Sequence, residues 1–190
     1  MKGRYAAAFT AALFILCISV SDAYAQRWSI GTNAVDYLNL GTLNAEGSLA
    51  VARHLSFNVG ARFNPWTFHH GEQTRQFENR KRCYYAGVRY WPWHIYSGWW
   101  TAFQLQYQEY NRGGVFRLQT EEGDAYGVGV SFGYTLMVHK AFNIEFGVGV
   151  WTGGARYVTY SCPYCGTVID EGDKFFFWPN NVMISLVYIL

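Results

Sequence analysis

The stretch AYGVGVSFGYTL, residues 125–136, alternates without a break between two kinds of side chain. The large set is Tyr126, Val128, Val130, Phe132, Tyr134 and Leu136, and the small set is Ala125, Gly127, Gly129, Ser131, Gly133 and Thr135. Successive side chains of a β-strand point to opposite faces of the sheet. This period therefore predicts one long strand with a bulky apolar face and a face of small residues.

The same alternation recurs at residues 55–64, 103–108 and 142–151, and the smaller set again consists mainly of Gly, Ser, Asn and Gln. A soluble β-sandwich would carry Lys, Glu and Thr on the face that meets water. Small polar residues instead suit the crowded interior of a narrow barrel, and large aromatic residues suit an exterior that meets lipid. The composition agrees with a barrel, because 51% of the residues are hydrophobic and only 15% are charged.

We expect an all-β fold, an antiparallel up-and-down meander of about eight strands that forms a transmembrane barrel of the outer-membrane type. The strands are expected at residues 28–38, 43–51, 55–66, 82–92, 99–110, 124–137, 142–152 and 176–190. Short turns at residues 52–54, 93–98 and 138–141 alternate with long loops at residues 67–81, 111–123 and 153–175. Short periplasmic turns and long outer loops are typical of such barrels. The alternating end, Ile184 to Leu190, fits a terminal strand that the barrel-assembly machinery recognises.

The N-terminus has the features of a secretory signal peptide, which we place at residues 1–25. A basic start is followed by an apolar run at residues 6–20 and by Ala23-Tyr24-Ala25, a small-x-small cleavage site. The apolar run is too short to span a bilayer as a helix. We therefore expect export through a cleaved signal peptide and a single barrel domain at residues 26–190 in the bacterial outer membrane. The net charge of +2, without a basic stripe, gives no indication of a nucleic-acid partner.

The motif Cys162-Pro163-Tyr164-Cys165 allows three interpretations. A thioredoxin-like redox site needs a helix after the first cysteine, and the residues that follow have no helical period. A zinc site would need a histidine to join the two cysteines, since the second half of a four-cysteine site is missing. We favour a disulfide between Cys162 and Cys165 that staples an exposed loop of an exported protein. Cys83 then remains a single thiol, facing the barrel interior near its outer rim.

Four charged residues fall on the predicted inward face: Glu46, Arg62, Arg89 and Glu145. A lone charge in a narrow lumen is costly, so we expect these groups to pair with one another or with lumen water. They could serve a gated pore or a plugged interior. We favour the plug, because an eight-stranded barrel leaves an interior just wide enough for side chains.

The aromatic residues near the two ends of the predicted strands are expected to form two interfacial belts. One belt would comprise Trp91, Trp93, Trp99 and Trp100, and the other Trp66, Phe68 and residues 175–178. His69, His70 and Tyr164 are surface-loop candidates for contact with other molecules. We assign no catalytic residue, no metal ligand and no cofactor.

Six stretches carry a resemblance to a known family: SFNVGARFNPWTF, GVRYWPW, GVGVSFGYT, NIEFGVGVW, SCPYCG and ISLVYIL. The chain resembles the uncharacterised small outer-membrane β-barrels of Bacteroides-type bacteria that form domain of unknown function 3575. The resemblance implies an outer-membrane barrel, often encoded near surface fimbrial components, with no established catalytic residues. It also implies that Cys162 and Cys165 are a shared loop feature.

We therefore expect an outer-membrane β-barrel with a structural or surface-interaction role, with the loops at residues 67–81 and 153–175 as contact sites. By analogy it would be accessory to the assembly of a fimbria or another surface appendage. The expected partners are lipopolysaccharide and phospholipid of the outer membrane and a surface or fimbrial protein. The alternatives are an outer-leaflet lipid-modifying enzyme on a small barrel, a small pore, and a soluble exported barrel that binds an apolar ligand.

Overall fold

A computed structural model describes residues 27–68, 77–113, 119–162, 166–179 and 182–190. The predicted signal peptide lies outside these ranges. The elements are β1 (Trp28–Asn33), α2 (Ala34–Leu38), β2 (Leu43–Ala52), β3 (Leu55–Asn64), β4 (Thr67–Phe68), β5 (Phe77–Tyr90), β6 (Gly98–Gly113), β7 (Thr120–His139), β8 (Phe142–Tyr160), β9 (Val168–Trp178) and β10 (Met183–Ile189).

The sheet closes into a ring of eight antiparallel strands, in the order β10–β1–β2–β3–β5–β6–β7–β8. The ring closes because β8 pairs with β10 through its first residues, from Phe142 to Gly147. The later residues of β8, from Trp151 to Tyr160, pair with β9 instead. The all-β meander of about eight strands is therefore confirmed, with a last strand that is divided into β9 and β10.

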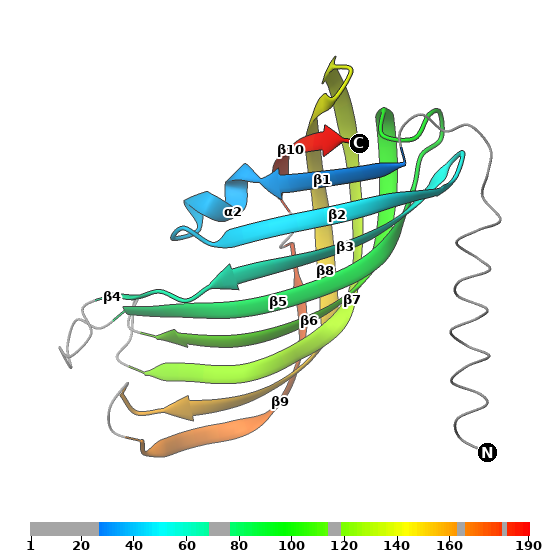
Figure 1. Cartoon of the computed structure of the whole chain (residues 1–190). Helices are drawn as coiled ribbons and strands as arrows, with labels where there is room; N and C mark the ends of the chain where they lie inside the picture. Colours follow the sequence, from blue (N-terminus) through cyan, green and yellow to red (C-terminus); the bar gives the residue numbers. More distant parts are fainter. Residues whose placement is uncertain (1–26, 69–76, 114–118, 163–165, 180–181) are drawn as a thin grey trace, which may run out of the picture.

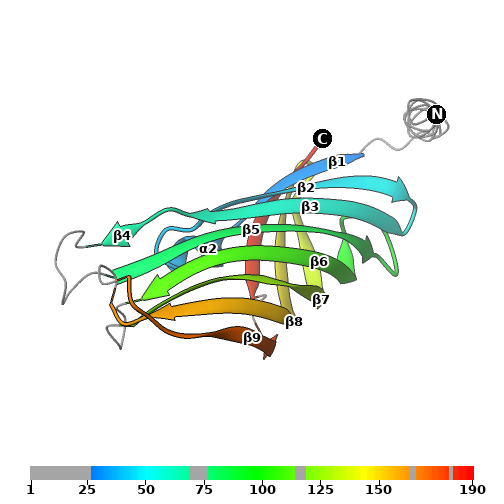
Figure 2. The same ribbon diagram turned by 90° about the horizontal axis from the view of Figure 1, so that it is seen from below.

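Beyond the ring, the long strands continue as an open, curved shell (Figure 1). β5, β6, β7 and β8 extend past the ends of β1, β2 and β3, and β9 forms one side of the shell (Figure 2). β9 pairs with β8 along one edge, and within the described ranges its other edge is paired with no strand. The wall is thus complete at one end and has a lateral gap beside β9 at the other end.

The two faces of the strands are inverted relative to a water-soluble protein. On β3 the outward residues Phe57 and Val59 are 43% and 48% exposed, whereas the inward Ser56 and Asn58 are 0% and 1% exposed. The same holds for β7, where the outward Val130 and Phe132 are about half exposed and the inward Ser131 is buried. The alternation described above therefore places large apolar side chains outside and small polar side chains inside.

Glycine on the inward face makes room for a few large side chains. A Cβ atom on Gly133 would collide with the indole of Trp100, and a Cβ on Gly60 would collide with the ring of Tyr85. Trp91 and Tyr96 of the short β5–β6 connection fold into the same end of the ring beside Trp100. The core inside the ring thus combines these aromatic side chains with Ala102, Met183, Val187 and Ile189.

Two features differ from the expectations of the sequence. Residues 34–38 form α2 and not the end of a strand, because the Asn33 side chain accepts a hydrogen bond from the Val35 amide and caps the helix. The strands β5 to β8 run further into the predicted loops, because sheet neighbours on both sides satisfy their backbone groups. Within the described residues, no helix is long and apolar enough to cross a membrane.

The predicted aromatic belts are wrong for three residues. Trp91, Trp100 and Phe176 are buried inside, whereas Trp93 and Trp99 are exposed as expected. The reason for Trp100 is the alternation itself, since adjacent residues of a strand cannot both face outward.

Candidate functional site

The interior of the ring contains a charged cluster centred on Arg89. This guanidinium contacts Glu46 at 2.8 Å through Nη2 and Glu145 at 2.9 Å through Nη1. The remaining carboxylate oxygens accept hydrogen bonds from the Tyr85 hydroxyl, at 2.9 Å to Glu46, and from the Thr135 hydroxyl, at 3.1 Å to Glu145. Both carboxylates and the two terminal nitrogens of Arg89 are therefore satisfied inside the protein, whereas the buried Nε of Arg89 has no hydrogen-bond partner among the described residues.

The Arg89 side chain also packs against aromatic rings. Its guanidinium carbon lies 4.2 Å from the ring centre of Trp100 and 5.6 Å from that of Trp91. The free volume beside this cluster is about 20 Å³, room for about one water molecule. The interior of the ring is therefore filled by side chains.

Arg62, the fourth predicted charge, has a different partner. Its Nε lies 3.0 Å from Asp36 of α2, and its guanidinium lies over the ring of Tyr85 at 5.2 Å. Both members of the Arg62–Asp36 pair are mostly buried, with 7% and 14% of the side chain exposed. This pair holds α2 against the wall of the ring, above the Arg89 cluster.

The sequence interpretation missed Tyr85 as a member of this cluster and Asp36 as the partner of Arg62. Alternation placed Thr135 inside, without indicating its bond to Glu145, and the parity of Tyr85 with Arg89 could have placed Tyr85 there too. The capping pair of Asn33 and Asp36 was the signal for α2, since Asn at the cap and an acidic residue in the first turn favour a helix start.

The outward face of the shell changes from apolar to charged along one row of the sheet. Cross-strand pairing aligns five charged residues on neighbouring strands, which we call the charged row: Arg82, Glu109, Asp124, Arg156 and Asp173. The next outward row towards the ring is mostly aromatic, namely Tyr84, Tyr107, Tyr126, Gly154 and Phe175.

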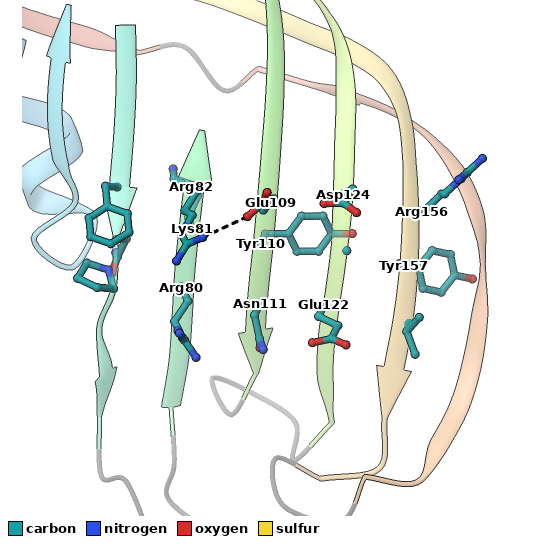
Figure 3. A pocket seen from close by; sticks show the side chains of 15 residues that line it. Arg80, Lys81, Arg82, Glu109, Tyr110, Asn111, Glu122, Asp124, Arg156 and Tyr157 are labelled. Carbon is teal, nitrogen blue, oxygen red and sulfur yellow. Dashed lines mark ion pairs between the residues drawn. The ribbon is translucent and has the colours of Figure 1, made fainter. Parts of the chain in front are cut away.

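Four members of the charged row, Arg82, Glu109, Asp124 and Arg156, line an outward groove of about 520 Å³ that runs from the end of β3 across β5 to β8 (Figure 3). Two ion pairs lie along the charged row, Arg82 to Glu109 at 3.8 Å and Arg156 to Asp173 at 3.4 Å. All four side chains are about half exposed or more. Such exposed pairs stabilise the fold little.

On the inward face of the same shell, Glu121 joins two cations. Its Oε1 lies 2.6 Å from Nζ of Lys174 and 3.1 Å from Nη2 of Arg112. Burial alone would raise the pKa of Glu121, but the hydrogen bond from Lys174 and the charges of Arg112 and Lys174 outweigh it, so the pKa is lowered. Glu121 is thus held as a carboxylate between the ends of β6, β7 and β9.

The cysteine motif is described only in part. Cys162 is disulfide-bonded, and Cys165 lies outside the described residues, so their pairing with each other stays a prediction. His69, His70 and Tyr164 also lie outside the described ranges. Cys83 is a buried free thiol on the inward face of β5. The described residues contain no group of three or more histidine, cysteine, aspartate or glutamate side chains that could hold a metal ion.

Comparison with known sequences gives one match. The family described as "Protein of unknown function (DUF3575)" matches residues 11–190. No curated protein and no solved structure matches the chain.

Proposed function

Because the chain belongs to the DUF3575 family of proteins of unknown function, which brings no activity with it, we propose its role from its surfaces. We propose an outer-membrane β-barrel whose ring is closed to solutes and whose shell has a structural or surface-interaction role. The observation that carries this proposal is the exposed apolar band below the charged row. This apolar band ends, on the side of the charged row, in a row of aromatic residues, as the lipid-facing band of an outer-membrane barrel does.

The height of the band fits a bilayer. On β7 the outward residues from Tyr126 to Leu136 are all apolar or aromatic, and their exposed fractions range from 37% to 57%. At about 3.3 Å per residue and a tilt of about 40°, this stretch covers about 25 Å along the barrel axis. That is the height expected of the lipid-facing band of an outer-membrane barrel. A soluble protein seldom exposes a continuous apolar surface of this kind.

The filled ring argues against the pore that the sequence left open. Arg89 is held by two carboxylates and by Trp100, and the remaining free volume is about one water molecule. The cluster instead ties together β2, β5 and β8, which lie far apart around the ring. Buried charges satisfied in this way suit a plug that fixes the arrangement of the strands.

The membrane location is tested by extraction of washed cell envelopes. We expect the protein to stay in the membrane pellet in high salt, alkaline carbonate and urea, and to be released by detergent. Release by salt alone would contradict the proposal and would favour a soluble exported barrel.

The orientation is tested by labelling Cys162 on intact cells in a Cys83→Ser background. A membrane-impermeant maleimide is applied before and after mild reduction. Labelling only after reduction supports an outward-facing shell with a bonded Cys162. Labelling that requires lysis of the cells would place the shell on the other side of the membrane and contradict the proposed orientation.

The surface role, accessory to the assembly of a fimbria or another appendage, is tested by deleting the gene. We expect altered surface attachment and an unchanged acylation pattern of the membrane lipids. A changed acylation pattern with unaltered attachment would contradict this role and favour the lipid-modifying enzyme.

A further inference from the structure

The concave face of the open shell contains a cavity of about 260 Å³, which we call the vestibule. Its walls come from β5 to β9: Asn79, Lys81, Gln108, Tyr110, Arg112, Ala125, Trp151, Ala155, Lys174, Phe176 and Trp178. The hollow exists because the facing residues of β7 and β8 are small. Gly127 pairs with Gly153, and Ala125 pairs with Ala155, so nothing larger than a methyl group extends from these positions into the space.

The lining of the vestibule changes along the strands from charged at the outer end to aromatic at the deeper end. The cations gather at the outer end: Lys81 and Arg112 lie above the level of the charged row, and Lys174, one residue below it, reaches Glu121 with its ammonium group. Trp151, Phe176 and Trp178 lie deeper, level with the outward apolar band. Trp151 and Phe176 are in contact, with ring centres 4.4 Å apart. The cavity therefore offers a positive end near the proposed membrane surface and an aromatic end at membrane depth.

Among the described residues, the inward charges at the outer end are unequal in number. Lys81, Arg112 and Lys174 face two carboxylates, Glu121 and Asp170, so one positive charge is in excess. Glu121 is shared by Arg112 and Lys174, and Asp170 accepts a hydrogen bond from Tyr157. Within the described residues Lys81 has no ion pair, and burial together with the charge of Arg62 lowers its pKa. An anion at this end would complete the pairing.

Two buried polar groups at the deeper end have no partner among the described residues. The indole N–H of Trp151 lines the vestibule, and the residue is 4% exposed. Both amide atoms of Gln106, also 4% exposed, are unpaired one step below Gln108 on the same face of β6. Buried polar atoms without a partner are rare in native proteins and call for an explanation such as a bound molecule.

The gap beside β9 gives a lateral way in. Lys174, Phe176 and Trp178 belong to β9, whose far edge is unpaired within the described ranges. The volume is somewhat below the roughly 300–1,000 Å³ of sites that enclose a whole small molecule. An occupant would thus be held along part of its length, with the rest leaving beside β9.

We propose that the vestibule binds an anionic amphiphile, with a phosphoryl head at Lys81, Arg112 and Lys174 and an apolar chain over Trp151 and Phe176. The placement of the aromatic end at membrane depth rests on the proposed membrane location. Binding of the amphiphile can be measured in detergent solution without it. The shared chemistry is a phosphoryl anion, which could come from a lipid or from free phosphate.

The test is a titration of the full chain in dodecyl maltoside, followed by native mass spectrometry. Dodecyl phosphate, dodecyltrimethylammonium and dodecyl maltoside share one chain and differ in the head. We expect saturable binding of dodecyl phosphate and none of the cationic amphiphile. Inorganic phosphate alone should bind at least about ten-fold more weakly, because it lacks the buried chain.

The variants are Lys81→Gln and Arg112→Gln, with Arg156→Gln as the matched control. Arg156 lies on the outward face of the same shell, with 78% of its side chain exposed. We expect each inward variant to weaken dodecyl phosphate binding about ten-fold or more, as loss of a charge-assisted hydrogen bond predicts, and the control to leave it unchanged. Equal effects of Arg112→Gln and Arg156→Gln would overturn the proposal.

Two wild-type results would also overturn it, whether or not a variant folds. These are equal binding of the cationic amphiphile, and phosphate binding as tight as that of dodecyl phosphate. If envelope extraction shows a soluble protein, the titration is repeated without detergent. The experiments thereby distinguish a failure of the proposed membrane location from a failure of the proposed binding site.

Discussion

Replacing Val130 by arginine places a charge near the middle of the exposed apolar band. Val130 faces outward from β7, is 50% exposed, and has Phe103 and Val150 as its cross-strand neighbours. The matched control is Val158→Arg on β8, which also faces outward. Val158 lies one row beyond the charged row, between Glu122 and Glu171.

The expected magnitudes differ because the two sites lie at different depths. A lipid-facing arginine costs about 2–4 kcal/mol at the bilayer midplane and about 0–1 kcal/mol near the interface. Val130→Arg should therefore lower the folding equilibrium constant by about 30- to 1,000-fold. Val158→Arg should change it little, since its charge is near two carboxylates and in contact with water.

The assay is reversible unfolding by guanidinium of the protein inserted in phosphatidylcholine vesicles, followed by tryptophan fluorescence. A surface substitution of a soluble protein usually changes the free energy of unfolding by no more than about 0.5 kcal/mol. If both variants unfold within that margin of the wild type, the apolar band does not face lipid, and the reasoning for a membrane barrel fails.

Three further outcomes are expected. Arg89→Gln should destabilise the protein by about 3–5 kcal/mol, because it leaves two buried carboxylates unpaired. Glu145→Gln should cost clearly less, since one carboxylate then faces one guanidinium; equal losses in guanidinium unfolding would contradict the cluster. In the shell, the lowered pKa of Glu121 stabilises the folded state above the ordinary pKa of 4.5, and this stability is lost as the pH falls through the lowered value. Glu121→Gln should flatten the dependence of the unfolding midpoint on pH at acid pH, and Glu122→Gln should leave this dependence as in the wild type. An unchanged pH dependence in Glu121→Gln would contradict the stabilising role of the Glu121 carboxylate. In planar bilayers the purified protein should add no conductance steps, because side chains fill the ring; regular steps would refute the plug.

The sequence predicts the wall of this protein well, because strand alternation is a local property. Parity alone places Glu46, Arg62, Arg89 and Glu145 inside, where the structure has them. Parity also shows that Trp99 and Trp100 must face opposite sides, an implication that the interfacial-belt interpretation overlooked. The fold class was therefore accessible from the residue pattern, and so was the side on which each strand residue lies.

The extent of the strands was not accessible in the same way. Glycines such as Gly123 and Gly153 suggest loops when read along the chain, yet in the sheet they pair with neighbours and leave the vestibule open. The partner of Arg62 depends on α2 turning over the ring, which is a non-local arrangement. The vestibule was missed for the same reason. It exists because small residues of β7 and β8 face each other, and that pairing depends on the register of the sheet.

The pairing of the first strand, β1, with the last strand, β10, decides when the ring can close. β1 pairs with β10, and the Ile184 amide donates a hydrogen bond to the Asn33 side chain, 151 positions earlier. The first strand must therefore wait for the last residues to be synthesised and delivered. Contacts between such distant segments form slowly, and until then both edges remain open to pairing with other chains. The C-terminal segment thus completes assembly, because a chain that ends before Met183 lacks the strand that joins β1 to β8 and closes the ring.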